Sequence, residues 1–217
     1  MKQENYVISF LNELVRTPAA ELDSAITRVL GRMGQICETD RAYIFKFRDN
    51  AFFDNTHEWV AEGVAPMRDH LQNLPLDRLS PWRDRLDRDD IIHVPDVADL
   101  DDNDPQKAFL VHQGIMSLLV VQIIQDDQLV GMAGLDRTHQ VASFSPDEIQ
   151  MQRAVADVIQ SALVRQEALQ DLERTRDKLE LTLAALPDLL VEVDHQGIYR
   201  ACHHKMAFSW APDPQAA

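Results

Sequence analysis

The stretch from Gly114 to Asp136 constrains the fold of this chain more than any other. Two apolar runs stand on either side of the short polar segment Gln125–Gln128. The first run is rich in β-branched residues and is too short to cross a bilayer. Because apolar residues resume directly after the polar segment, the pattern predicts a tight antiparallel hairpin. The runs do not alternate with polar residues, so we expect both faces of the hairpin to be covered, as in the centre of a sheet.

Two glycines in the second run indicate close contacts. Gly131 and Gly134 lack a side chain, and we expect a large group or another backbone to approach them there. The sequence leaves open whether the hairpin is only part of the core or also contacts a ligand.

Composition narrows the class of protein. The chain has 217 residues, a hydrophobic content of 45% and a formal net charge of −15. It can therefore bury a core, whereas its charge disfavours nucleic acid and anionic membrane surfaces as partners. The N-terminus lacks a signal-peptide pattern, and the two cysteines, Cys37 and Cys202, lie far apart. These features predict a cytoplasmic protein with reduced or idle thiols.

The N-terminal part predicts two helices followed by two strands. Apolar residues recur at helical spacing over 3–16, and a second helix is expected to open with Thr17 as N-cap and Pro18 at its first position. The segment 41–48 and the segment through Phe52 to Trp59 are typical of strands joined by a turn.

Residues 62–105 form a long connection in which prolines recur. The expected elements are short helices at 67–72 and 81–88, a strand at 91–94 and a helix at 105–112 that leads into the hairpin. A connection of this length commonly forms a lid or a pocket wall, and a purely structural cover over the sheet is the alternative.

A long helix is expected after the hairpin. Ser145, Pro146 and Glu148 fit an N-cap, a first position and a capping-box acid, and no Pro or Gly follows until Pro187. Apolar residues recur at heptad spacing from Val155, with interruptions at two arginines, which predicts a coiled coil and hence a homodimer. A single helix packed on its own domain is the alternative. The residues predicted for the dimer interface are Val158, Ala162, Leu169, Leu172, Leu179, Leu183 and Leu186.

The C-terminal residues predict the start of another domain. A strand is expected over 187–194, a turn at 195–197 and a second strand from Ile198. The remaining length is too short for a domain with its own core, and the tail 211–217 is expected to be disordered.

The sequence does not predict catalysis. We find no phosphate-binding loop, dinucleotide fingerprint, zinc-protease motif, nucleophile elbow or kinase signature. The eight histidines are scattered, so no metal site is predicted.

Taken in order, the expected elements resemble a GAF domain, the small-molecule sensor module of bacterial signalling proteins. Local segments sharpen the resemblance to the variety that precedes PAS domains, diguanylate cyclases and histidine kinases, over about residues 20–165. The segments that carry it are 55–59, 63–66, 71–75, 81–82, 92–96, 113–119 and 131–136, and 183–197 is similar to the opening of a PAS domain. The resemblance implies an α+β fold: an antiparallel sheet of about five or six strands, helices on one face and pocket elements on the other, followed by a long signalling helix.

The resemblance also implies a domain plan. The expected parts are an N-terminal helix (1–17), a GAF sensor domain (18–160), a coiled-coil signalling helix (161–186), and a truncated PAS start with a disordered tail (187–217).

What the resemblance implies about function is a non-catalytic sensor whose ligand is unnamed. The motif of cyclic-nucleotide GAF domains, the cysteine set of sulfoxide reductases and a suitably placed bilin-attachment cysteine are all missing. A small molecule or ion is expected between the sheet and the long connection, with its state passed through a dimeric helix to an output domain such as a diguanylate cyclase or histidine kinase. The alternatives are a ligand-free dimerisation scaffold and, weakest, an enzyme. The predicted ligand contacts are Tyr43, Phe45, His57, Trp59, Trp82 and His93, although His57 and Trp59 also fit an ordinary strand surface and His93 an ordinary structural histidine.

Overall fold

The fold was examined in a computed structural model, which describes residues 2–80, 82–185, 190–196 and 198–203. The chain divides into two compact units, residues 1–165 and 166–217, and the boundary falls within the longest helix. No helix among the described residues is long and apolar enough to cross a membrane.

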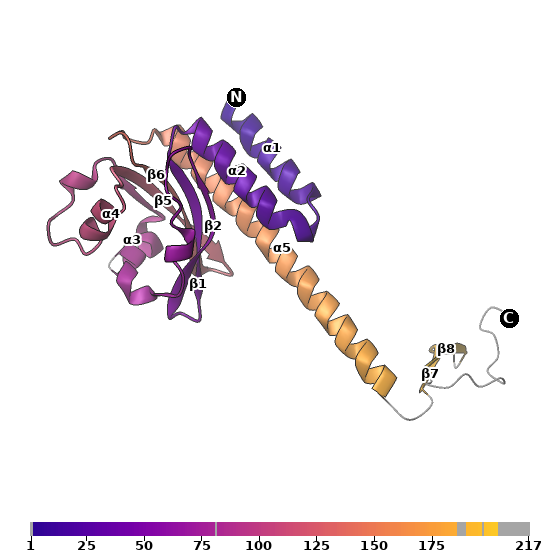
Figure 1. The fold of residues 1–217 in the computed structure, drawn as a ribbon. Coiled ribbons are helices and arrows are strands. Elements are labelled where there is room, and N and C mark those ends of the chain that lie inside the picture. Colours follow the sequence, from indigo (N-terminus) through magenta and orange to yellow (C-terminus); the bar gives the residue numbers. More distant parts are fainter. Residues whose placement is uncertain (1, 81, 186–189, 197, 204–217) are drawn as a thin grey trace. The chain divides into compact units, whose positions relative to one another are not determined.

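The first unit is built on a six-stranded antiparallel sheet with the order β3-β2-β1-β6-β5-β4 (Figure 1). The predicted hairpin supplies β5 and β6, and β6 pairs with β1 in the middle of the sheet. The strands are β1 (Arg41–Arg48), β2 (Phe52–Val60), β3 (Leu74–Pro75), β4 (Ile91–Val94), β5 (Ser117–Gln125) and β6 (Gln128–Arg137).

The turn of the central hairpin explains its register. Asp126 and Asp127 both adopt positive φ angles, 51° and 58°, as a two-residue hairpin turn of the favoured twist requires. The expected close contacts at the two glycines are also found. A Cβ atom at Gly131 would overlap the carbonyl oxygen of Phe45, and one at Gly134 would overlap the ring of Tyr43.

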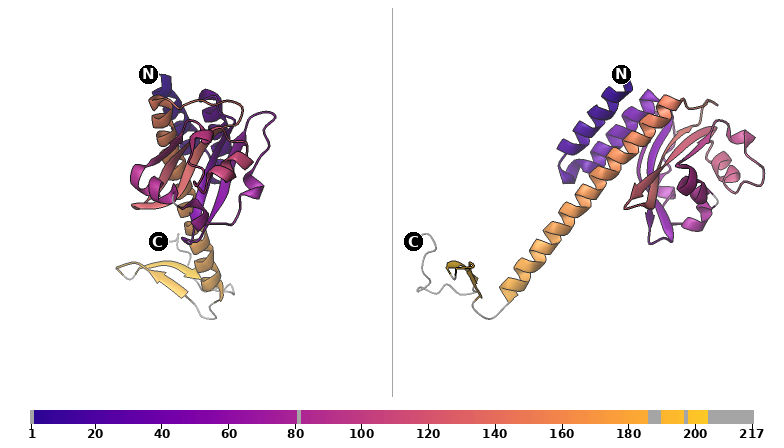
Figure 2. Two further views of the ribbon diagram at one scale, coloured as in Figure 1. Left: turned by 90° about the vertical axis from the view of Figure 1, so that its left-hand side faces the viewer. Right: turned by 180° about the vertical axis from the view of Figure 1, so that it is seen from behind.

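Three helices lie on one side of the sheet, and α1 is the outermost of them, as Figure 2 shows from two sides. Within the first unit their buried side chains form one cluster with residues from β1, β5 and β6, among them Ile26, Met33, Leu119 and Ile159. These helices are α1 (Lys2–Arg16), α2 (Leu22–Ile36) and α5 (Pro146–Ala185). The predicted α+β fold, with a six-stranded antiparallel sheet and a long C-terminal helix, is confirmed.

The start of α2 differs from expectation. Thr17 does not act as its N-cap, because the Thr17 hydroxyl donates to the carbonyl of Glu13 (2.7 Å) and so extends the last turn of α1. A short 3₁₀ turn, Ala19–Glu21, then leads into α2 at Leu22.

The start of α5 matches the prediction. Ser145 and Glu148 form a capping box, in which the Ser145 amide donates to the Glu148 carboxylate (2.7 Å) and the Glu148 amide donates to the Ser145 hydroxyl (3.3 Å). Arg137, at the end of β6, donates to the carbonyl of Cys37 (2.8 Å) and to Glu148 (3.1 Å). The end of α2 and the start of α5 are thus tied to the central strand.

The residues predicted for the dimer interface fall into two groups. Val158 and Ala162 lie in the helix-side core of the first unit, whereas Leu169, Leu172 and Leu179 are exposed. The single helix packs on its own domain up to Arg165, so the alternative weighed from the sequence holds for this part of α5. The side chain of Leu183 and the whole of Leu186 lie outside the described residues.

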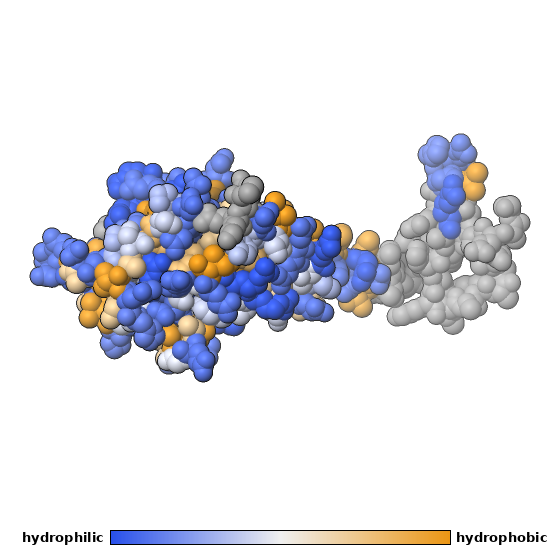
Figure 3. Space-filling view, turned by 90° about the horizontal axis from the view of Figure 1, so that it is seen from above, coloured by the Kyte–Doolittle hydropathy of each residue, from blue (hydrophilic) through white to orange (hydrophobic). Residues whose placement is uncertain are grey.

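The opposite face of the sheet carries the long connection. It contains α3 (Trp82–Asp89), α4 (Lys107–His112) and 3₁₀ turns that include Arg68–His70. Beyond α5, β7 (Leu190–Val193) pairs antiparallel with β8 (Tyr199–His203), while the tail 211–217 lies outside the described residues. Figure 3 shows one face of the molecule, on which hydrophilic residues predominate, in keeping with the net charge of −15.

Candidate ligand-binding site

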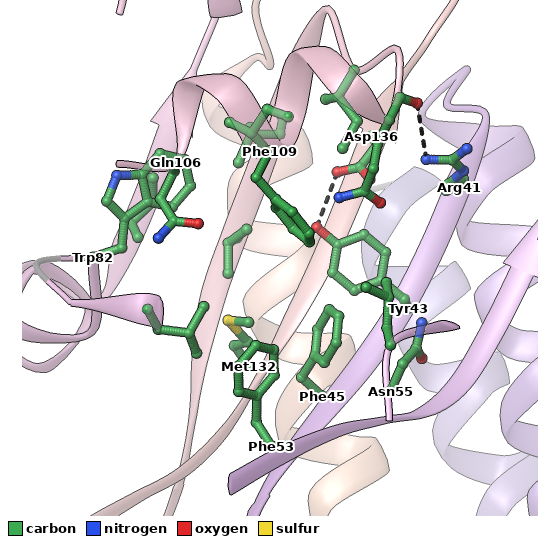
Figure 4. Close-up of a pocket in the computed structure, with 18 of the residues that line it drawn as sticks. Arg41, Tyr43, Phe45, Phe53, Asn55, Trp82, Gln106, Phe109, Met132 and Asp136 are labelled. Atoms are coloured by element: carbon green, nitrogen blue, oxygen red, sulfur yellow. Dashed lines mark hydrogen bonds between the residues drawn. The ribbon is translucent and has the colours of Figure 1, made fainter. Parts of the chain in front are cut away.

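A cavity lies between the sheet and the connection that carries α3 and α4 (Figure 4). It has a volume of about 60 Å³, which is room for a few water molecules or a small organic molecule. The lining residues include Arg41, Tyr43, Phe45, Phe53, Asn55, Glu58, Trp82, Gln106, Phe109, Leu118, Val120, Met132 and Asp136.

The sheet supplies an aromatic wall. Tyr43 and Phe45 alternate with Ala42 and Ile44 along β1, so their side chains share the cavity face while the latter two enter the helix-side core. The ring centroids of Tyr43 and Phe45 lie 5.2 Å apart, and Phe53 of β2 continues the row at 5.4 Å from Phe45, each pair edge to face.

The connection supplies the facing wall. Trp82 is buried, and its indole nitrogen donates to the carboxylate of Asp104 (3.2 Å). The side-chain amide of Gln106 donates to the carbonyl of Arg78, which fixes the segment before α4. In Figure 4 the ring of Phe109 points from α4 into the cavity.

A carboxyl–phenol pair is buried at the strand ends. The Tyr43 hydroxyl donates to Oδ1 of Asp136 (3.0 Å), and Asp136 is only 2% exposed. Burial raises the pKa of Asp136 to about 7, although the bond from Tyr43 and the charge of Arg41 act in the opposite direction. Burial also raises the pKa of Tyr43, with a further contribution from Asp136. At neutral pH the Asp136 carboxyl is therefore divided between its protonated and ionised forms.

Arg41 brings a permanent positive charge to the same end of the cavity. It is 5% exposed, and its terminal nitrogens donate long hydrogen bonds to the carbonyls of Gln113 (3.5 Å) and Ala65 (3.4 Å). Its Nε atom is buried and has no hydrogen-bond partner among the described residues. A buried donor without an acceptor costs free energy, and an acceptor in the cavity that reached Nε would remove this cost.

Glu58 links the sheet to the connection. Its Oε2 atom accepts hydrogen bonds from the amides of Met67 (2.9 Å) and Arg68 (2.8 Å). Nearby, the main-chain amide of Asn55 donates to the main-chain carbonyl of Leu71 (2.8 Å). The wall of the cavity is thereby held by main-chain hydrogen bonds as well as by apolar packing.

Three of the predicted ligand contacts line the cavity and three do not. Tyr43, Phe45 and Trp82 lie where the sequence predicted them. His57 and Trp59 instead face α2, where His57 lies 3.3 Å from Asp23 and Trp59 packs against glycines of α2. The structure therefore corrects the expected position of these two residues.

A β-bulge in β2 is the physical reason that His57 and Trp59 face α2. Ile44 pairs with His57 and Phe45 pairs with Asn55, so Thr56 is an extra residue in β2. Because side chains alternate along a strand, this extra residue places Asn55 on the cavity face and His57 on the helix face.

The expected position of the His93 side chain is also corrected, for a simpler reason. On β4 it alternates with Ile92 and Val94, which face the cavity side, so its ring lies on the other face. There its Nε2 atom accepts a hydrogen bond from the amide of Phe144 (3.1 Å), and burial lowers its pKa. His93 thus holds the segment before α5 rather than a ligand.

Sequence reasoning missed the charged and amide side chains of the cavity, among them Arg41, Asn55, Glu58, Gln106 and Asp136. One signal was available for Asp136, which follows Met132 and Gly134 at strand spacing and so shares their face. For Arg41, the corresponding sign was its place two residues before Tyr43 in the same strand, and so on the same face.

Comparisons with known proteins agree with this architecture. A family model described as "GAF domain" matches residues 21–163. The methanogenesis regulatory histidine kinase FilI of Methanothrix harundinacea (strain 6Ac) is 31% identical over 165 residues, which cover 74% of this chain. The matched region covers 18% of FilI, so the chain spans less than a fifth of the length of this relative.

Solved structures similar to this chain include bilin-binding photoreceptors. The phycocyanobilin-bound GAF domain from a cyanobacterial phytochrome has a TM-score of 0.64 and 21% identity, covering 77% of this chain and 97% of its own. The chromophore-binding domain of the bacteriophytochrome RpBphP3 from R. palustris has a TM-score of 0.65 and 15% identity, and the match covers 76% of this chain and 61% of that domain. The blue-light absorbing form of the Thermosynechococcus elongatus PixJ GAF domain has a TM-score of 0.59 and 24% identity, and the match covers 76% of this chain and 97% of that domain. At these identities the likeness is one of fold.

Proposed function

This chain belongs to the GAF domain family, and from that premise we propose that it is the ligand-sensing region of a signalling protein. A small molecule binds in the cavity between the sheet and the α3–α4 connection, and the domain itself carries out no reaction. The observation that carries the proposal is the cavity, which combines an aromatic wall with buried polar groups at one end. Tyr43, Phe45 and Trp82 are the proposed apolar contacts.

The relatives support a sensory role. One similar protein is named as a regulatory histidine kinase, and one similar structure holds phycocyanobilin. The ligand of this chain is smaller than a bilin, because an open-chain tetrapyrrole far exceeds a cavity of about 60 Å³. Cys37 also lies in the helix-side core, where burial raises its pKa to about 12, and it does not line the cavity.

The signal is proposed to leave through α5. Binding biases a protein only if the ligand favours one of two arrangements, and the α3–α4 connection is the part that a ligand would draw towards the sheet. The sheet separates the cavity from the helices, and α5 packs on its helix side. We propose a cytoplasmic homodimer through α5, with an output domain such as a histidine kinase or diguanylate cyclase beyond it. The exposed leucines of α5 support this arrangement.

A second candidate is a dimerisation scaffold that binds no ligand. The small volume of the cavity favours it, because aromatic side chains of the domain itself, including Phe109, already occupy much of the space. In that case the GAF domain would only position the helices of two chains.

A metabolite screen by thermal shift separates the two candidates. Ligands of the proposed site should raise the melting temperature of the wild-type chain and of Trp59→Ala, whose indole lies on the helix side, but not that of Trp82→Ala. Stabilisation that survives Trp82→Ala would move the site elsewhere. A screen without hits would favour the scaffold.

A further inference from the structure

Two buried arginines at neighbouring strand positions differ in how their hydrogen bonds are satisfied. Arg137 is 4% exposed, and its three nitrogens donate to the carbonyls of Glu38 (3.3 Å), Ala142 (2.9 Å) and Cys37 (2.8 Å). It also has a full counter-charge, because Nη2 lies 3.1 Å from the carboxylate of Glu148. Arg137 is therefore a satisfied structural residue.

Arg41 is buried to the same degree as Arg137, but within the described part of the chain it lacks a comparable set of hydrogen bonds and an ion pair with a carboxylate. Its two hydrogen bonds, at 3.4 and 3.5 Å, run to neutral main-chain carbonyls, and its Nε atom has no partner among the residues that the structure describes. A guanidinium stays charged at any physiological pH, and a buried charge is normally paired with an anion. Since Arg41 lines the cavity, that anion can come from a ligand.

The two carboxyl groups that line the cavity do not fully meet this need. Glu58 is engaged by the amides of Met67 and Arg68, and Asp136 is engaged by the hydroxyl of Tyr43. Burial holds the pKa of Asp136 at about 7, so this carboxyl is neutral for part of the time at neutral pH. These two carboxyl groups therefore compensate the charge of Arg41 only in part.

Most of the other residues that line the cavity are apolar. Phe45, Phe53 and Met132 come from the sheet, and Trp82 and Phe109 come from the connection. A ligand that satisfies both ends has an anionic head and a short apolar body, and a volume of about 60 Å³ limits that body to a short aliphatic chain.

We propose that the cavity binds a small aliphatic carboxylate, with the carboxylate on the Arg41 guanidinium and the aliphatic chain against Phe45, Phe53 and Trp82. A carboxylate can accept two parallel hydrogen bonds from the planar guanidinium fork, one of them from Nε. This inference rests on the proposed sensory function and names the class of ligand.

Asp136 makes the binding depend on pH. The charged and titratable groups that act on it are Arg41, Tyr43, Glu58 and Asp40. When Asp136 ionises it repels the ligand and competes for Arg41, so affinity falls as pH rises through 7. Between pH 6 and pH 8 the dissociation constant should rise by about tenfold if only the protonated form of Asp136 admits the ligand. The ligand itself stays ionised, because an ordinary carboxyl group has a pKa of about 4.

The test uses propionate and butyrate as probes, with propionamide and butyramide as neutral matches of the same shape. Binding to the full chain is followed by ¹H–¹⁵N NMR at the Trp82 indole and the Arg41 Nε–H. Both carboxylates should bind saturably, and both amides should bind at least about tenfold more weakly, since charge-assisted pairs exceed neutral ones.

Variants separate recognition of the ligand charge from a general destabilisation of the domain. Arg41→Gln should weaken butyrate binding by about tenfold or more without changing butyramide binding. Asp136→Asn, which keeps Arg41, should bind butyrate as tightly or more tightly and should abolish the pH dependence. Arg85→Gln, on α3 but outside the lining, is the control and should behave as the wild type. If Arg41→Gln does not fold, the amide comparison and the Asp136→Asn pH profile decide the question.

The outcomes are distinct. Amides that bind as tightly as carboxylates, unchanged affinity in Arg41→Gln, or an absence of carboxylate binding would each overturn the inference. If neutral molecules bind at Trp82 while carboxylates do not, the inference fails and the sensory function stands. If neither class binds and the metabolite screen is empty, the sensory function fails as well.

Discussion

The indole ring of Trp59 lies against the backbone of Gly34, in the space that a side chain at that position would occupy. Trp59 belongs to β2 and Gly34 to α2, so this contact fixes how closely the helix approaches the sheet. Gly31, one turn earlier in α2, meets the same ring. The two glycines thus form a flat surface on the helix for one aromatic side chain.

Gly34→Ala should therefore destabilise the domain. At an open helix position this change stabilises by up to about 1 kcal/mol, because alanine is the better helix former. Here the new methyl group would overlap the Trp59 ring, and overpacking costs about 1–3 kcal/mol. Chemical denaturation should show a loss for Gly34→Ala, while the exposed control Gln35→Ala should stay within about 0.5 kcal/mol of the wild type. A gain in stability for Gly34→Ala would contradict the contact.

Asp136→Asn should change how stability depends on pH. The folded-state pKa of Asp136 is raised to about 7, so between about pH 4 and pH 7 the folded chain holds a proton that the unfolded chain has lost. The ionised group is increasingly unfavourable in the folded chain as pH rises, and this cost is complete above the folded pKa. The stability of Asp136→Asn relative to the wild type should thus increase with pH across this window, by at most about 1.4 kcal/mol per pH unit, and then level off.

Urea denaturation at a series of pH values measures this difference. Asp171→Asn, on an exposed part of α5, is the control for a simple change in net charge. A difference between Asp136→Asn and the wild type that is constant from pH 4 to pH 8 would show that the carboxyl does not titrate in this way.

Arg165→Ala should loosen α1. The guanidinium of Arg165 donates to the carbonyls of Val15 (2.6 Å), Leu14 (2.8 Å) and Thr17 (3.4 Å), at the end of that helix, where main-chain carbonyls lack the next helical turn. Removing it should cost about 1–3 kcal/mol and speed amide hydrogen exchange in residues 5–16. The control is Arg153→Ala, whose ion pair with Asp90 is long at 3.9 Å and exposed. Exchange in α1 that is equal in both variants would contradict the role of Arg165.

The proposed dimer can be tested with charged substitutions on α5. Leu172 and Leu179 lie in the predicted heptad seam and are 67% and 58% exposed, and Leu181, at 73%, lies outside the seam. Leu172→Glu combined with Leu179→Glu should weaken dimerisation by at least about a hundredfold, since each buried leucine contributes about 1.5–3 kcal/mol. Leu181→Glu should have little effect. Light scattering that finds the wild-type chain monomeric at high concentration would remove the dimer from the mechanism.

The sequence predicted those parts of the fold that depend on local chemistry. The hairpin turn at Asp126 and Asp127, the capping box at Ser145 and the close approach at Gly134 all follow from what these residues permit in a short segment. The order of these elements resembles that of a GAF domain, and this resemblance implied the sheet with its helices on one face.

The site was only partly predictable, because it depends on one extra residue in β2. Thr56 carries no sign in the sequence that it will be skipped in the pairing with β1, yet this decides that His57 faces α2 and Asn55 faces the cavity. Arg41 and Asp136 were missed for another reason. Charged residues at strand ends are usually exposed, and only the tertiary structure shows that the connection buries these two.

Adjacent residues of β1 have different surroundings: Tyr43 lines the cavity, and Ile44, whose Cα is about 3.8 Å further along the chain, belongs to the core under the helices. A structural change on the cavity face can therefore reach the helix-side core without a chain of intermediary residues, because side chains on both faces share the same peptide bonds. Substitutions that leave recognition intact but silence the response should therefore concentrate at the alternating positions of β1 and β6. A search for a longer communication route through the domain would look in the wrong place.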